Sequence, residues 1–183
     1  MSSTRPGGTR ERIQAAALEL FAVRGVQQTS LRAIAERLGI TKPALYYHFG
    51  SRAELLHSLV QPVVDDVEML LAEDEARGDG DARALLARYF DVAVMHRAIT
   101  TVVFRDPAAL AELDLAPRVL AWRRRLTALL AGPDPPLGAQ ARAMVAIGGM
   151  GDCIAMFAHR PVGELRAAVL DAACAALGVQ PSP

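Results

Sequence analysis

The sequence predicts an all-α protein of about nine helices, and three observations favour this fold class. Hydrophobic residues make up 52% of the 183 residues and aromatic residues only 5%, and alanine and leucine dominate, which favours helices over strands. Apolar residues recur every three or four positions, as on the buried face of a helix. Glycine and proline cluster between these segments, where helices end. A chain of this length can bury a core and form one or two small domains.

The first eight residues read as a solvated arm, although its Arg5 could alternatively touch a phosphate or a minor groove. The first helix is expected over residues 9–24. Gly25 should end it, because glycine adopts the conformations of a helix end at low cost. We expect this helix to pack beneath the two that follow. Its apolar face consists of Ile13, Ala16, Ala17, Leu20 and Phe21.

The stretch 29–49 has the pattern of two short helices joined by a tight turn. Ser30 is expected to cap the first helix, and Gly39 to end it in a left-handed conformation. Thr41 should cap the second helix, which has Pro43 in its first turn, where the missing N–H removes no helical hydrogen bond. The spacing therefore predicts a helix-turn-helix. The apolar stripe of its first helix consists of Leu31, Ile34, Ala35 and Leu38.

The second helix of the pair has an unusual outer surface. Ala44, Leu45 and Phe49 supply inward contacts, which leaves long polar or aromatic side chains to point outward. A major groove admits one α-helix, and the N-terminal residues of a recognition helix meet the base edges. This surface therefore predicts DNA binding, whereas a hairpin that only packs leaves it unexplained. The outward residues are Lys42, Tyr46, Tyr47 and His48.

Charge is divided unequally along the chain. The formal net charge is zero overall, but residues 1–52 contain eight basic and three acidic side chains, which leaves this end at about +5 and the remainder at about −5. Such a division is expected of a nucleic-acid-binding end attached to a part with another role.

A fourth helix is expected to begin after Gly50, with Ser51 and Glu54 forming a capping box. Pro62 should kink or divide this helix, because proline lacks an N–H and clashes with the preceding turn. We place a joint between domains here. The sequence thus predicts a DNA-binding domain at 9–60 and a helical ligand-binding and dimerisation domain at 61–183.

Further helices are expected in the second domain, at 82–98, 99–104, from 117 to Gly132, 138–159 and 162–177, with a short helical piece at 108–115. The last two are apolar on more than one face, which a monomer would have difficulty covering. We therefore expect them to form half of a four-helix dimer interface. The sequence does not tell which face is used. The residues assigned to the interface are Ile147, Gly148, Gly151, Ile154, Leu165, Val169, Ala172 and Ala176, and a second stripe contains Val145, Gly149 and Met156.

The residues from Arg10 to about Leu59 resemble the DNA-binding module of the tetracycline-repressor (TetR/AcrR) family of bacterial regulators. The resemblance covers about a third of the chain and includes Thr29-Ser30-Leu31-Arg32, Leu38-Gly39-Ile40 and Leu45-Tyr46-Tyr47-His48-Phe49. It implies a homodimeric transcriptional regulator, usually a repressor. We expect a cytoplasmic protein, because the first residues lack the apolar core of a signal peptide and no stretch has the length of a membrane span. Its expected partners are a pseudo-palindromic double-stranded DNA operator, a second copy of the chain, and a small apolar effector that releases the DNA.

The expected DNA contacts follow from side-chain chemistry and from this resemblance. Arg32 can reach a guanine edge with two hydrogen bonds, and Lys42 can reach a base or a phosphate. The resemblance places Ala44 among the base-facing residues, where a hydrogen-bonding side chain is common, so only apolar contact with a thymine methyl is expected from it. The full predicted set is Ser30, Arg32, Thr41, Lys42, Ala44, Tyr46, Tyr47, His48 and Arg52.

An effector pocket could be formed by apolar and aromatic residues of the second domain, although an ordinary core position is the alternative for each. These residues are Met95, His96, Phe104, Trp122, Met144, Met150 and Phe157. A DNA-binding protein without a ligand is the main alternative function.

No sequence motif of a hydrolase, zinc protease or phosphate-binding loop occurs, so we expect no enzyme and no cofactor. Cys153 and Cys174 lack the spacing of a metal site, and a thiol sensor is their alternative role.

Overall fold

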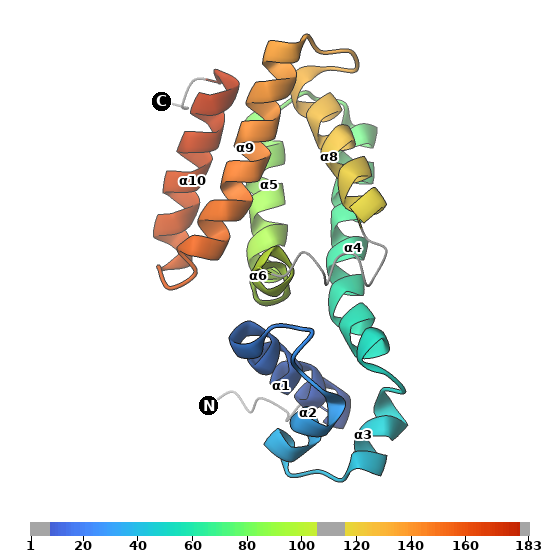
Figure 1. The fold of residues 1–183 in the computed structure, drawn as a ribbon. Coiled ribbons are helices and arrows are strands. Elements are labelled where there is room, and N and C mark those ends of the chain that lie inside the picture. The colour runs from blue at the N-terminus through green and yellow to red at the C-terminus, as the bar shows by residue number, and fades with distance from the viewer. Residues whose placement is uncertain (1–7, 106–115, 180–183) are drawn as a thin grey trace, which may run out of the picture. The chain divides into compact units, whose positions relative to one another are not determined.

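The computed structural model describes residues 8–105 and 116–179, except for the side chains of residues 103–105 and 116 (Figure 1). Over these residues the chain is all-α, as predicted, with nine helices and no strand. The short helical piece expected at 108–115 lies outside the described residues. The helices are α1 (Thr9–Arg24), α2 (Leu31–Leu38), α3 (Lys42–His48), α4 (Arg52–Arg77), α5 (Ala82–Met95), α6 (Arg97–Arg105), α8 (Ala116–Ala131), α9 (Leu137–Met156) and α10 (Val162–Leu177).

Two predicted helix ends differ from the structure. Helix α5 ends at Met95 rather than at residue 98, because His96 interrupts the helix and α6 begins at Arg97. Helix α9 ends at Met156 rather than at residue 159. Neither end has a glycine or proline beside it in the sequence, so no local signal marks it.

The described residues form two compact units. The first contains residues 8–61 and 101–105, and the second contains residues 62–100 and 116–179. In the first unit, α1 packs on α2 and α2 on α3. Apolar side chains from α1 to the start of α4 are fully covered there, and the largest are Ile13, Phe21, Ile34, Leu45, Phe49, Leu55 and Leu56.

Helix α4 is one continuous helix of 26 residues that passes through Pro62. Of the two outcomes predicted for this proline, a kink or a division of the helix, the division is therefore wrong. Apolar residues on both sides, such as Val60 and Val64, are buried, and burial of this kind outweighs the hydrogen bond that proline removes. The boundary between the two units nevertheless falls between residues 61 and 62.

In the second unit, α9 lies between α8 and α10, and α10 also packs on α5 (Figure 1). One hydrophobic cluster joins α5, α9 and α10 around Phe90, Met150 and Leu170. A second cluster joins α4, α5, α8 and α9 around Leu71 and Leu126. The side chain of Tyr89 packs against both clusters. Burial raises the pKa of its phenol above the ordinary value.

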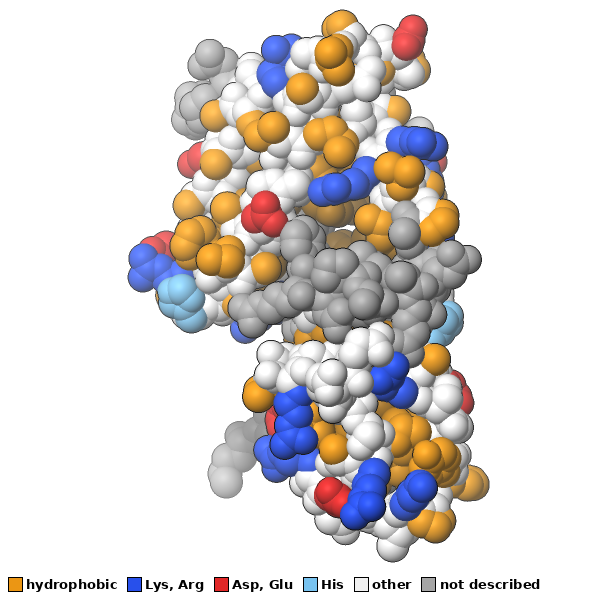
Figure 2. Space-filling view, in the orientation of Figure 1, with side chains coloured by type: hydrophobic (Ala, Val, Ile, Leu, Met, Phe, Trp, Pro, Cys, Tyr) orange, Lys and Arg blue, Asp and Glu red, His pale blue; other side chains and the backbone are white. Residues whose placement is uncertain are grey.

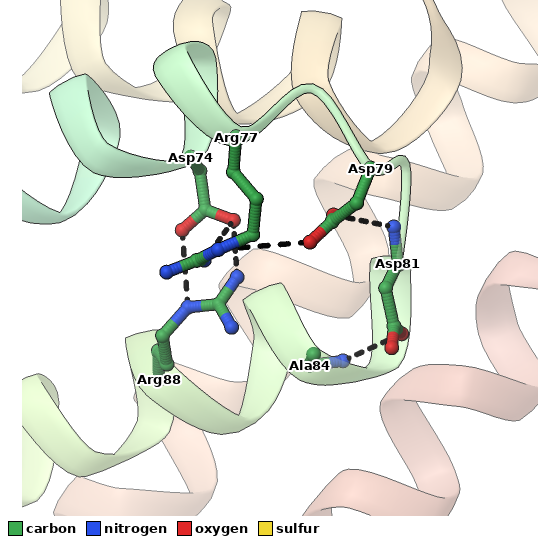
Figure 3. Close-up of polar contacts among 6 residues, drawn as sticks. All are labelled: Asp74, Arg77, Asp79, Asp81, Ala84 and Arg88. Carbon is green, nitrogen blue, oxygen red and sulfur yellow. Dashed lines mark hydrogen bonds and ion pairs between the residues drawn. The ribbon is translucent and has the colours of Figure 1, made fainter.

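A buried aspartate joins α4 to α5 (Figure 3). Asp74 is 5% exposed. Arg88 of α5 binds both of its carboxylate oxygens, and Arg77 also pairs with it, 3.4 Å away. The loop that follows is closed by Asp81, whose carboxylate accepts a hydrogen bond from the backbone N–H of Ala84 at 2.9 Å and so caps α5. These contacts fix the turn between the two helices.

Candidate nucleic-acid interface

The turn between α2 and α3 has the geometry that the sequence predicts. Ser30 accepts a hydrogen bond from the backbone N–H of Ala33 at 3.1 Å, which caps α2. Gly39 ends the helix with φ of +67°, in the left-handed conformation. Thr41 accepts a hydrogen bond from the N–H of Ala44 at 3.3 Å and caps α3. Both cap hydroxyls are thereby used as acceptors and keep an O–H that can donate to a phosphate.

Helix α3 has one buried and one exposed side. Leu45 is fully buried, whereas Tyr47 is 87% exposed and Tyr46 is 43% exposed. Lys42 and Ala44 are also exposed, and His48 is partly covered. The Lys42 ammonium lies 5.4 Å from the centre of the Tyr46 ring, within cation–π range. The structure thus leaves Lys42, Ala44, Tyr46 and Tyr47 exposed and covers His48 in part. Figure 2 shows Lys and Arg side chains around hydrophobic ones on the visible face of this unit.

Arg10 of α1 supports the C-terminal end of α3. Its guanidinium donates a hydrogen bond to the backbone carbonyl of His48 at 3.0 Å. It also lies 4.3 Å from the centre of the buried Phe49 ring. The last carbonyls of a helix carry partial negative charge, so a cation here is favourable. Sequence reasoning placed Arg10 only in the basic end of the chain, because a contact 38 residues away leaves no local signal.

Arg52, for which a phosphate contact is predicted, also makes hydrogen bonds within its own unit. Its Nη1 donates to the backbone carbonyl of Gln27 at 3.0 Å, and its Nη2 donates to the Gln27 side chain at 3.1 Å. These bonds tie the start of α4 to the segment before α2. Arg52 therefore also supports the scaffold of the site.

Arg32 is paired with an acid on its own helix. Its Nε–H donates to the Glu36 carboxylate at 2.7 Å. This hydrogen bond raises the pKa of the Arg32 guanidinium. The spacing of four residues is the one at which helix side chains meet, so this pair could have been found from the sequence.

The residues assigned to the dimer interface divide between two environments. Ile147, Ile154, Leu165 and Val169 are at most 7% exposed and lie in the core of their own unit. Their assignment is wrong, because they are already covered by the same chain. Gly148, Gly151 and Ala176 are partly covered, whereas Ala172 is exposed.

The accessible apolar surface of α9 is instead the second predicted stripe. Val145 is 64% exposed and Met156 is 70% exposed, and Gly149 is exposed between them. Several exposed residues of α10 are small, among them Ala168, Ala172 and Ala175. Figure 2 shows hydrophobic side chains spread over the visible face of these two helices.

The predicted effector residues do not share one environment. Met150 is buried in the cluster of α5, α9 and α10, and Trp122 packs against the edge of the other cluster. Met95, Met144 and Phe157 are 40–69% exposed. His96 lies with its Nε2 2.6 Å from the Asp66 carboxylate. The side chain of Phe104 is outside the described residues.

Helices α4 and α8 are joined by a polar network. The Trp122 indole N–H donates to Glu68 at 2.6 Å, and Arg125 also binds Glu68. Arg125 makes two further hydrogen bonds to Glu75, at 2.8 and 2.9 Å. The hydrogen bond from Trp122 lowers the pKa of Glu68, and that from Arg125 lowers the pKa of Glu75.

Among the described residues, no group of histidine, cysteine or acidic side chains is arranged to hold a metal ion. None of the helices there combines the length and apolar character needed to cross a membrane.

Helices α2 and α3 and the turn between them form a helix-turn-helix. Residues 13–59 match the family model described as bacterial regulatory proteins, tetR family. This match confirms, over these residues, the resemblance to the TetR family that was found in the sequence.

Several known proteins are similar to the chain. The transcriptional regulator TtgR of Pseudomonas putida is 37% identical over 91 residues, which are 48% of this chain and 43% of TtgR. The class A tetracycline repressor of Escherichia coli is 39% identical over 87 residues, 44% of this chain and 37% of that protein. The chain thus spans less than half the length of these relatives. The structure of the ketosteroid regulator KstR2 of Mycobacterium tuberculosis matches 97% of both chains with a TM-score of 0.75 at 18% identity, which supports the fold.

Proposed function

We propose that the chain is a transcriptional regulator that binds a pseudo-palindromic operator as a homodimer in the cytoplasm. The observation that carries this proposal is the exposed row of Lys42, Tyr46 and Tyr47 on α3, whose opposite side is anchored by the buried Leu45. Two copies of α3 would enter successive major grooves, roughly 34–36 Å apart. Residues 9–60 would form the DNA-binding domain, and residues 61–183 the domain that pairs the copies and binds the effector.

Within this interface the side chains divide by chemistry. Arg32 reads a guanine edge, and Lys42 meets a base or a phosphate. Ser30 and Thr41 donate their O–H groups to phosphates, as does Tyr46. Tyr47 and His48 face bases, and Ala44 contacts a thymine methyl. Arg52 supports these residues through its bonds to Gln27.

The two copies would meet through α9 and α10. The exposed stripe of Val145, Gly149 and Met156 faces the partner, together with the small residues Ala168 and Ala172 of α10. Small residues allow helices of a four-helix interface to approach closely. Burying large exposed apolar side chains such as Met156 would supply much of the driving force.

Substitution of two exposed valines, one on the proposed dimer surface and one elsewhere, tests the interface. The variant Val145→Glu places a charge on the proposed dimer surface and is expected to shift the protein to monomer in sedimentation or light-scattering measurements. The control is Val23→Glu, because Val23 is 83% exposed but lies on α1, and it should leave the dimer intact. A Val145→Glu protein that remains fully dimeric would rule out this surface.

The proposed signal is a small apolar effector. It binds more tightly to a dimer conformation in which the two recognition helices are wrongly spaced for the operator, and it therefore lowers the fraction of dimers that can bind DNA. The supporting feature is the group of partly buried residues at the edge of the α4–α5–α8–α9 cluster, which includes Tyr89, Val92 and Trp122. An effector there would act as a release signal for a repressor. Regulation as an activator would depend on the operator's place relative to a promoter.

DNA binding is tested on the region upstream of the protein's own gene. We expect a sequence-preferring band shift that Lys42→Ala weakens at least 10-fold. Arg124→Ala removes the same charge from an exposed position of α8 and should change affinity little. No preference for any sequence would contradict the proposal.

Thermal shift against apolar metabolites tests the effector, and a lack of any shift would favour the alternative of a regulator without a ligand.

A further inference from the structure

The face of α2 that carries Arg32 also carries an acid. Glu36 lies one turn after Arg32, and both side chains are well exposed, at 63% and 78%. An exposed carboxylate beside DNA is repelled by the phosphates, so it weakens binding to every sequence alike. Its presence on this face therefore calls for a compensating role.

The contact between the two side chains involves one particular edge of the guanidinium. Glu36 accepts a hydrogen bond from Nε of Arg32 at 2.7 Å. No hydrogen bond within the described residues occupies its two terminal nitrogens. A guanidinium is planar and presents five N–H groups in a fixed fork. With the Nε side held back by Glu36, the terminal nitrogens form the free edge.

The backbone holds both residues in place. Ser30 caps the turn that carries Arg32, and the carbonyl of Glu36 accepts a hydrogen bond from the N–H of Gly39 at 3.2 Å, at the end of the helix. Arg37 of the same helix binds Glu19 of α1 at 3.0 Å. The Arg32–Glu36 pair thus lies on a short helix fixed at both ends and tied to α1.

We propose that Glu36 is a positioning residue for sequence readout, which holds the Arg32 guanidinium so that its two terminal nitrogens face O6 and N7 of one guanine. The inference rests on the proposed function of Arg32 as a base-reading residue. Two parallel hydrogen bonds from an arginine are the commonest specific contact to guanine. Because Glu36 already restricts the Arg32 side chain, less conformational entropy is lost when Arg32 binds the guanine. Glu36 therefore strengthens binding only at sites with that guanine.

This proposal separates the charge of Glu36 from its hydrogen bond. The variant Glu36→Gln removes the charge but keeps a carbonyl oxygen that can accept from Arg32 Nε. The variant Glu36→Ala removes both. Charge loss alone should raise affinity for all DNA sequences in both variants, whereas loss of the acceptor should change base preference only in Glu36→Ala.

The experiment measures affinity of the full chain for an operator duplex, selected from its own upstream region, and for duplexes with each half-site guanine replaced. Relative to wild type, Glu36→Ala is expected to lose roughly 3- to 10-fold of the preference at one guanine, a part of what a bidentate pair supplies. Glu36→Gln should keep most of that preference. In an Arg32→Ala background, Glu36→Ala should cause no further loss.

The matched control is Glu19→Gln, which removes the partner of Arg37 and the same charge from the same unit. It should change affinity for all duplexes alike. Unchanged base preference in Glu36→Ala, with Arg32→Ala losing preference at one guanine, would overturn the role of Glu36 alone. If Arg32→Ala itself keeps every preference, the assignment of Arg32 has failed, and the role of Glu36 fails with it. Circular dichroism melting of each variant shows that the fold is retained.

Discussion

Trp122 of α8 donates its indole N–H to the Glu68 carboxylate of α4, with 2.6 Å between Nε1 and Oε1. Glu68 and Glu75 both have a lowered pKa in the folded protein. Each carboxyl therefore stabilises the fold above its ordinary pKa of 4.5, and this stabilisation is lost as the pH falls through the lowered value. Because both side chains are more than 40% exposed, solvent screening limits the effect to about 1 kcal/mol or less.

The predicted result is a free energy of unfolding that decreases below pH 4.5 less steeply in Glu68→Gln than in wild type. Urea denaturation between pH 3 and 7 measures it. Glu73→Gln is the control, because Glu73 is exposed on the same helix and makes no hydrogen bond or ion pair among the described residues. Equal pH dependence in wild type and Glu68→Gln would argue against a stabilising network.

Removing Asp74 should be costly. Asp74→Ala leaves Arg88 without its main partner in a partly buried position and loosens the turn between α4 and α5 (Figure 3). We expect a loss of about 2–4 kcal/mol in the free energy of unfolding. Asp79→Ala, at the exposed end of the same network, should cost less than about 1 kcal/mol. Similar losses in the two variants would show that burial of Asp74 is unimportant.

Arg10 should affect DNA binding without touching DNA. Arg10→Met removes the hydrogen bond to the His48 carbonyl and the cation over Phe49, so we expect the free energy of unfolding to fall by about 1 kcal/mol. Specific binding should weaken, while the salt dependence of affinity stays the same. A change of about one in the slope of log affinity against log salt would instead identify a phosphate contact. Arg12→Met, at an exposed position of α1, should leave stability unchanged.

Two neighbouring residues of α3 should separate folding from recognition. Leu45→Ala empties a fully buried position and is expected to cost about 2–5 kcal/mol. Tyr47→Ala changes a side chain that is 87% exposed, so stability should stay within about 0.5 kcal/mol of wild type while operator affinity falls. Thermal melting and fluorescence anisotropy distinguish the two. A Tyr47→Ala protein with full affinity would remove Tyr47 from the interface.

Local features of the fold were predictable because neighbouring residues determine them. The caps at Ser30 and Thr41 and the left-handed Gly39 depend on hydrogen bonds that span only a few residues. The sequence also identified Lys42, Tyr46 and Tyr47 as exposed, whereas Ala44, which was expected to point inward, is exposed and His48 is partly covered. The break at His96 lacked such a signal.

Features set by distant contacts were not predictable in this way. Arg52 and Arg10 bind residues 25 or more positions away. From its charge, Arg52 was predicted to contact a phosphate, and Arg10 was given no specific role. Periodicity showed that α9 has two apolar faces, but it could not tell that Ile147 faces its own chain while Val145 remains exposed. Such choices depend on how neighbouring helices pack.

Lys42 stands at the start of α3, exposed, and is the only lysine among the 183 residues. The other 19 of the 20 lysine and arginine residues in the chain are arginines. Arginine does not react with reagents directed at amines. Besides the α-amino group of the chain, an acetyl group or fluorophore directed at amines can therefore be attached to only one side chain, without introducing a cysteine or any other substitution. That side chain lies on α3, the helix proposed to enter the major groove.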